Sequence, residues 1–201
     1  MKYERILSFG ASPSDSFEID RTTYKSTDFI IAVDGGITKL RKSGIKPNVF
    51  FGDCDSCLSD DKIWINESNF DVNIYPQKKE KSDFELASDF ILDNWKNPLE
   101  VNIYGMMYGR TDHFLFNIEI AVKMSIHGFE VTFIGENEKL IVSNGLKPII
   151  LNVKKNKKRY IAIPFQIYIF SFDIVVSRHP NFGNFFHHTS DIFMCYVIGI
   201  Y

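Results

Sequence analysis

The chain has 201 residues, of which 45% are apolar and 24% are charged, and its formal net charge is −2. This size and apolar content fit one large domain or two small ones with a substantial core. The lack of a basic excess argues against a nucleic-acid partner, so we expect small-molecule ligands or a second copy of the chain. The apolar stretch 160–176 is interrupted by Pro164, Gln166 and Asp173. It falls short of the roughly 20 apolar residues of a membrane span, so no membrane partner is expected.

The N-terminal segment Met1 to Arg5 runs into the first apolar stretch without the pattern of a secretory signal. The three cysteines of the chain are too few for a disulfide framework. Both features predict a cytoplasmic protein.

Short apolar runs alternate with helical patterns through residue 128. Strands are predicted at 5–9, 29–33, 49–51, 72–75 and 101–104. Three helices are predicted. One spans 37–43, the second begins at a capping box formed by Ser82 and Glu85, and the third spans 112–126. The run 29–33 is apolar throughout, as in a parallel strand that is covered on both faces. The alternation predicts an α/β fold in which a doubly wound, mostly parallel sheet occupies residues 1–128.

The pattern changes after Gly128. Strand-like runs at 129–134, 139–142, 149–153 and 160–163 follow one another with turn signals and no helical period. Residues 129–201 are therefore predicted to form a small, antiparallel, sandwich-like β domain.

Two carboxylates one residue apart, Asp53 and Asp55, follow the apolar run 49–51. Side chains on an extended chain alternate between faces, so both carboxylates are expected on one side. Alone, the pair is equally consistent with loop aspartates that cap the next helix. Asp34 and Asp83 follow other predicted strands, however, and the carboxyl ends of parallel strands share one edge of a sheet. Asp53, Asp55 and Asp83 are therefore predicted to hold Mg²⁺, with Asp34 close by.

Groups suited to a polyphosphate accompany these carboxylates. Gly35 and Gly36 permit a close approach of backbone to a phosphate. The predicted cations are Lys78, Lys79, Lys81 and Arg110. His113 and Asn117 are four residues apart and share a helical face, which favours a ligand role over a locally satisfied histidine.

Cys54 and Cys57 form a Cys-x-x-Cys pattern. A zinc site lacks a second cysteine pair, and the aspartates that flank Cys54 disfavour the thiolate of a redox cysteine. We expect these cysteines to be small apolar fillers.

Four motifs, in this order and spacing, resemble those of the thiamine pyrophosphokinase family. They are Asp34-Gly35-Gly36, Gly52-Asp53-x-Asp55-Ser56, Lys79-Glu80-Lys81-Ser82-Asp83-x-Glu85 and Gly109-Arg110-x-Asp112-His113-x3-Asn117. The resemblance spans roughly residues 29–165 and implies transfer of pyrophosphate from ATP to the hydroxyl of thiamine, with Mg²⁺. It also implies a homodimer with a C-terminal β-sandwich.

The resemblance also assigns residues to roles. Catalytic roles fall to Asp53, Asp55, Asp83, Arg110 and Asp112. Nucleotide or substrate contacts fall to Asp34, Gly35, Gly36, Lys79, Ser82, Arg110, His113 and Asn117. No protein nucleophile is needed, because phosphoryl transfer depends on positioning and charge neutralisation.

The chain departs from the family pattern at three places. Cys54 replaces the usual bulky apolar residue, and Tyr108 replaces a glycine, where its side chain is expected to crowd the loop of Arg110. After about residue 165 the family's strand-turn pattern is missing, which fits either an altered reading frame or ordinary divergence. Two other functions stay open: a metal-dependent nucleotide-sugar transferase, and an inactive nucleotide-binding remnant with a damaged C-terminal domain.

Overall fold

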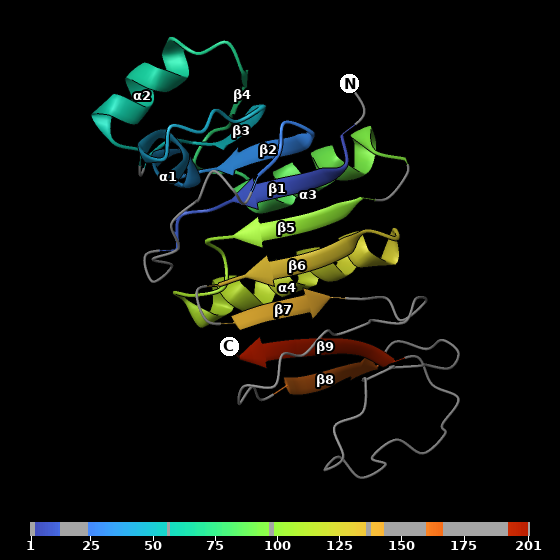
Figure 1. The fold of residues 1–201 in the computed structure, drawn as a ribbon. Helices are drawn as coiled ribbons and strands as arrows, with labels where there is room; N and C mark the ends of the chain where they lie inside the picture. The colour runs from blue at the N-terminus through green and yellow to red at the C-terminus, as the bar shows by residue number, and fades with distance from the viewer. Residues whose placement is uncertain are drawn as a thin grey trace.

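The computed structural model describes residues 3–12, 24–55, 57–96, 99–135, 138–142, 160–166 and 193–200. In this part of the chain nine strands form one sheet in the order β4-β3-β2-β1-β5-β6-β7-β9-β8 (Figure 1). The strands are β1 (Arg5–Phe9), β2 (Asp28–Val33), β3 (Val49–Gly52), β4 (Asp71–Ile74), β5 (Glu100–Tyr104), β6 (Glu130–Ile134), β7 (Glu138–Val142), β8 (Tyr160–Gln166) and β9 (Phe193–Ile200). The helices are α1 (Gly36–Lys42), α2 (Ser59–Asn66), α3 (Asp83–Asn94) and α4 (Thr111–Ile126).

Six of these strands are parallel, which confirms the predicted fold class. β1 pairs with both β2 and β5, and β3, β4 and β6 continue the parallel pairing outward. The chain fills the sheet from β1 to β4 on one side and then adds β5 and β6 on the other side of β1. The strand order therefore reverses between β1 and β5. In open α/β sheets, ligands bind at the carboxyl ends of the strands beside such a reversal.

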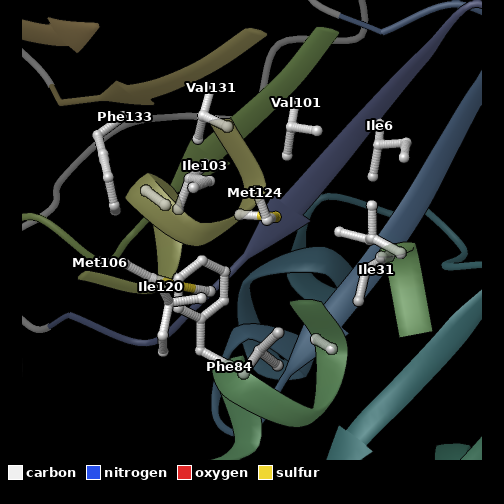
Figure 2. Close-up of a cluster of buried hydrophobic side chains, with 14 of the residues drawn as sticks. Ile6, Ile31, Phe84, Val101, Ile103, Met106, Ile120, Met124, Val131 and Phe133 are labelled. Atoms are coloured by element: carbon white, nitrogen blue, oxygen red, sulfur yellow. The ribbon is translucent and has the colours of Figure 1, made fainter. Parts of the chain in front are cut away.

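Helices cover both faces of the parallel sheet, so the sheet is doubly wound. Phe29, Ile31 and Val33 of β2 belong to the core under α3 and α4, which Figure 2 shows in part. Ile30 and Ala32, the alternate residues of the same strand, belong to a second core with α1 and α2. Burial on both faces explains why this strand is apolar at consecutive positions.

The C-terminal strands extend the same sheet in antiparallel fashion. β7 pairs with β6, β9 pairs with β7, and β8 pairs with β9. The antiparallel pairing was predicted, but its start at residue 129 is wrong by one strand, because β6 is parallel to β5. A continuous apolar pattern on a strand does not reveal the direction of its neighbour. The predicted strand 149–153 and the atypical tail at 167–192 lie outside the described residues, and the division into domains at 128/129 stays a prediction.

Helix α2 was not predicted, because it lacks the broad apolar face that marks most helices. A buried carboxylate anchors it instead. Only Asp61 and Ile65 of its eight residues are buried. Asp61 accepts hydrogen bonds from Thr38 Oγ1 at 2.5 Å, Arg41 Nε at 2.6 Å and the Leu58 amide at 3.0 Å. Desolvation opposes the charge of Asp61, but these hydrogen bonds outweigh it and lower the pKa of the carboxyl group. Among the described helices, none is both long and apolar enough to cross a membrane.

Candidate functional site

A pocket of about 930 Å³ opens at the carboxyl ends of the parallel strands, beside the reversal of strand order. Loops that follow each of the strands β1 to β5 contribute to it, together with the N-terminal turns of α3 and α4. Its polar and charged side chains are Ser12, Asp34, Asp53, Gln77, Lys79, Glu80, Lys81, Ser82, Asp83, Tyr108, Arg110, His113 and Asn117. The pocket thus collects residues from all four motifs of the sequence.

The pocket floor is formed where the chain segments after β1 and β5 meet. The Gly10 amide donates to the Tyr104 carbonyl and the Ser12 amide to the Gly105 carbonyl, both at 2.8 Å. Gly105 has a φ of +68°, and a Cβ at this position would lie 2.4 Å from the Gly10 carbonyl oxygen. Only glycine fits such a position, so this part of the floor consists of backbone.

Asp34, Asp53 and Asp55 form a compact acidic group beside this floor. One carboxylate oxygen from each residue lies within 4.8 Å of the other two. The Asp34 amide donates to the Phe51 carbonyl at 2.7 Å, which fixes the end of β2 against β3. A Cβ at Gly52 would lie 3.1 Å from the Asp34 Cα, so glycine allows the two carboxylate-bearing segments to approach.

The close approach of Asp53 and Asp55 was predicted, but extended alternation of side chains is the wrong reason for it. Cys54 between them has a φ of +61°, and Asp34 has a φ of +47°. Such left-handed backbone is uncommon outside glycine, and in functional sites it re-aims neighbouring side chains. The resulting bend lets the Asp55 amide donate to Asp53 Oδ1 at 3.1 Å.

Asp83, the predicted third metal ligand, lies in a different arrangement. Lys79 Nζ is 3.0 Å from Asp83 Oδ1 and 3.8 Å from Asp53 Oδ2, so the ammonium lies between two carboxylates. The Lys79 side chain is only 14% exposed. The Ser82 hydroxyl accepts from the Glu85 amide at 3.1 Å, which confirms Ser82 as the N-cap of α3 and places Asp83 in the first turn. Asp34 therefore takes the place expected of Asp83 in the acidic group.

Arg110 and Asp112 form a bidentate pair at the pocket rim. Arg110 Nε lies 3.1 Å from Asp112 Oδ1, and Arg110 Nη2 lies 2.6 Å from Asp112 Oδ2. Both side chains are largely exposed. The hydrogen bond from Arg110 lowers the pKa of Asp112, and the same bond raises that of Arg110. The guanidinium fork is thus held at the start of α4 by a partner that water or an anion can replace.

The helical face predicted for His113 and Asn117 does line the pocket. Asn117 Nδ2 donates to the Met106 carbonyl at 3.1 Å, which ties α4 to the loop after β5. Phe116 lies on the same wall, is 40% exposed and was missed by the sequence analysis. Its position three residues after His113 was the available signal. Tyr108, expected to crowd the loop, has its hydroxyl and ring edge against Gly135.

Four further predicted phosphate contacts have other surroundings. A Cβ at Gly36 would lie 1.9 Å from the Phe9 carbonyl oxygen, so this glycine serves the close packing of α1 on β1. Gly35, the N-cap of α1, does not line the pocket, and neither does Lys78. Lys81 lines the pocket, but its ammonium lies 2.6 Å from Asp89 Oδ2 of α3.

The two cysteines beside the acidic group are joined. Cys54 and Cys57 form a disulfide with a Cα–Cα distance of 4.8 Å. The expectation of two separate apolar fillers is therefore wrong. Cys57 nevertheless packs as an apolar side chain, since it is only 8% exposed and contributes to the core under α1 and α2.

The fold and the pocket define a doubly wound α/β protein with a group of carboxylates and cations at its switch point. The family model described as "Thiamin pyrophosphokinase, catalytic domain" matches residues 21–133. Thiamine pyrophosphokinase from Bacillus subtilis (strain 168) is 30% identical over 152 residues, which cover 75% of this chain and 69% of the relative. The chain belongs to the thiamine pyrophosphokinase family.

Solved structures of the family share the fold. The crystal structure of thiamine pyrophosphokinase from Bacillus subtilis superimposes with a TM-score of 0.69 and 21% identity, covering 98% of each chain. A thiamin pyrophosphokinase family protein from Enterococcus faecalis gives a TM-score of 0.68 and 19% identity, covering 98% of this chain and 99% of the other.

Proposed function

We propose that the chain transfers the pyrophosphoryl group of ATP to the hydroxyl of thiamine, giving thiamine diphosphate and AMP. The observation that carries the proposal is the group of Asp34, Asp53 and Asp55, with one oxygen of each within 4.8 Å of the others. Asp34 and Asp53 line the pocket together with Lys79, and Asp55 lies beside them. Family membership supplies the reaction. It also disfavours a nucleotide-sugar transferase, which would leave the motifs of Ser82–Asp83 and Arg110–His113 without a role.

The donor set fits Mg²⁺. This ion prefers hard oxygen ligands, and it usually binds one or two carboxylates together with substrate phosphates. Asp34 and Asp53 are partly buried and line the pocket, and Asp55 beside them is exposed, so a cation could reach all three carboxylates. When bound, Mg²⁺ would neutralise charge on the polyphosphate and orient it. We assign the metal ligands as Asp34, Asp53 and Asp55, and we assign Asp83 to the positioning of Lys79.

The cations of the pocket would bind and orient the polyphosphate. Lys79 is held by two carboxylates at 3.0 and 3.8 Å, so its ammonium is positioned before a ligand enters. Preorganised charge of this kind stabilises a transferring phosphoryl group without reorganisation during the reaction. Arg110 presents five donors at the rim and would exchange Asp112 for a phosphate that matches its fork.

His113, Phe116 and Asn117 line the pocket from the N-terminal part of α4. Asn117 is committed to the Met106 carbonyl, so we assign it to the support of the loop. We assign His113 and Phe116 to ligand contact, because both are exposed along the pocket.

The exposed Leu115 and Phe116, at 60% and 40%, also support a homodimer in which this end of α4 is covered. A cytoplasmic location is proposed as well.

The direct test is formation of AMP and thiamine diphosphate by the purified chain with Mg²⁺, ATP and thiamine. Both products should form in equal amounts. Asp53→Asn should lower turnover by at least about a hundredfold, since removal of one preorganised electrostatic group typically costs that much. The matched control is Asp71→Asn, which changes an exposed carboxylate outside the pocket. Normal turnover by Asp53→Asn would contradict the metal assignment, and absence of both products in the unaltered chain would contradict the function.

A further inference from the structure

The loop that carries Asp53 and Asp55 is fixed at both ends. On one side the Gly52 carbonyl accepts from the Tyr75 amide at 3.1 Å, at the end of β3. On the other side the Leu58 amide donates to the buried Asp61 carboxylate at 3.0 Å, at the start of α2. In the sequence only five residues separate these anchors, and the geometry of the acidic group depends on the path of the chain through Asp53, Cys54 and Asp55.

The Cys54–Cys57 disulfide sets that path. Its two Cα atoms are 4.8 Å apart, and Asp55 lies inside the ring that it closes. Cys54 is held at a φ of +61°, a left-handed conformation that a non-glycine residue adopts only when the surrounding structure imposes it. The bend at Cys54 also places the Asp55 amide on Asp53 Oδ1. The cross-link, the left-handed residue and the arrangement of the carboxylates therefore form one structural unit.

The two sulfur-bearing residues have different surroundings. Cys57 is 8% exposed and packs in the core with Ile37, Leu40 and Phe50. Cys54 is only partly buried, packs against the edge of the same core and lies between Asp53 and Asp55 in the chain. Opening the cross-link would leave the more buried Cys57 anchored in the core and would allow Cys54 to leave the left-handed conformation. Asp55 would move with it, because its hydrogen bond to the part of the described chain outside this loop comes from the exposed Gln77 Nε2, at 2.8 Å.

We propose that Cys54 and Cys57 are a redox-reversible thiol pair that controls the metal affinity of the pocket: the closed disulfide holds Asp55 beside Asp34 and Asp53, and reduction releases it. The inference rests on the proposed function, since it assumes that these carboxylates bind a divalent cation. It adds a modification site, because Cys54 occupies the position of the Gly52-Asp53-x-Asp55-Ser56 motif to which no role is assigned, and Cys57 lies outside the four motifs.

The chemistry is thiol–disulfide exchange with a dithiol. The thiolate of the dithiol attacks Sγ of Cys54, the more accessible sulfur, and forms a mixed disulfide. The Cys54–Cys57 bond breaks, and Cys57 leaves as a thiolate that takes a proton. The second thiol of the reagent then attacks its own sulfur in the mixed disulfide and releases Cys54. The cysteine pair gains two electrons and two protons, and the dithiol becomes a cyclic disulfide.

The test compares the two redox states of the unaltered chain. One sample is oxidised with glutathione disulfide and another is reduced with dithiothreitol, and both reagents are removed before measurement. Alkylation and mass spectrometry should find one reactive cysteine in the oxidised, denatured chain and three in the reduced chain, because the third cysteine, Cys195, lies outside the pair. Binding of Mn²⁺ alone, followed by the electron paramagnetic resonance signal of the free ion, then reports the site without substrates.

The oxidised chain should bind Mn²⁺ about tenfold more tightly than the reduced chain, since the loss of groups that orient metal ligands typically costs 10–100-fold in affinity. Reoxidation should restore tight binding. The double variant Cys54→Ser/Cys57→Ser should bind like the reduced chain in both states. The matched control Cys195→Ser should respond to reduction as the unaltered chain does.

Two results would overturn the inference while leaving the proposed function intact: equal Mn²⁺ affinity in both redox states, or three reactive cysteines after oxidation. A double variant that still responds to dithiothreitol would also overturn it. Absence of Mn²⁺ binding in either state is a different failure, because it removes the metal site itself and with it both the metal assignment and its redox control.

Discussion

Replacement of Gly36 by alanine tests whether this glycine serves packing or ligand approach. The sequence alone suggested close approach to a phosphate, whereas the structure places the Phe9 carbonyl oxygen 1.9 Å from a Cβ at this position. Ordinary van der Waals contact begins at 3.4 Å. The obstacle is the backbone of a central strand and cannot rotate away. Helix α1 would therefore have to withdraw from β1 by about 1.5 Å, a large displacement in a close-packed interior.

The expected cost follows from two opposing effects. Overpacking of a core typically costs about 1–3 kcal/mol, and a clash with backbone belongs at the upper end. Alanine recovers less than the roughly 1 kcal/mol that its better propensity gives in a helix interior, because Gly36 is the first residue of α1. The net loss of unfolding free energy is about 2 kcal/mol, which for a chain of this size lowers Tm by roughly 4–8 °C.

The assay is thermal unfolding followed by circular dichroism, with Lys42→Ala as the control because this side chain is exposed on the same helix. Lys42→Ala should unfold within about 2 °C of the unaltered chain, as most surface substitutions change stability by less than about 0.5 kcal/mol. A Gly36→Ala variant with unchanged or raised Tm but lost ATP binding would refute the packing argument and restore the phosphate interpretation.

Three further predictions concern single side chains. Lys79→Met should lower kcat/KM by about a hundredfold, because a hydrogen bond to a charged group is worth about 1.5–3 kcal/mol. The control Lys78→Met, which changes an exposed side chain, should have little effect in the same steady-state kinetic assay. Gln77→Ala should raise the Mg²⁺ concentration for half-maximal activity severalfold while the Tm stays constant, because Gln77 Nε2 orients Asp55 at 2.8 Å. The folded-state pKa of Asp61 is lowered, so its stabilising contribution is present above about pH 4 and is lost as the pH falls through the folded value. Asp61→Asn should accordingly lose about 2 kcal/mol at pH 7 and show a shallower fall in unfolding free energy below pH 4 in urea titrations, and an unchanged acid limb would contradict the assignment.

The sequence predicted the parallel sheet because a strand that is buried on both faces is apolar at consecutive positions. Continuous apolar runs such as 29–33 are consistent with few structures other than a covered strand, and β2 lies there. Helix α2 left no such mark, since its main anchor is the charged side chain of Asp61. Strand β9 was also missed, because its pairing with β7 and β8 joins segments far apart in the chain.

The site residues were predictable as types, but their partners were not. Asp53 and Asp55 were found because a short motif marks the end of a strand. The exchange of Asp83 for Asp34 in the acidic group depends on the lateral order of strands and on Lys79, which no local pattern encodes. The disulfide was not predicted, because the aspartates beside Cys54 were expected to disfavour a free thiolate. A cysteine that is already in a disulfide has no thiolate, so that argument does not apply to it.

The backbone floor between Gly10 and Gly105 has a consequence for the divergence of this pocket. Side chains cannot be added there without separating the two central strand ends, as the 2.4 Å approach to the Gly10 carbonyl oxygen shows. Changes in ligand preference must therefore arise in the walls, at positions such as Gln77 and Phe116 that strand packing does not constrain. The pocket thereby separates a base whose residues are constrained by folding from walls that can mutate at little cost to stability.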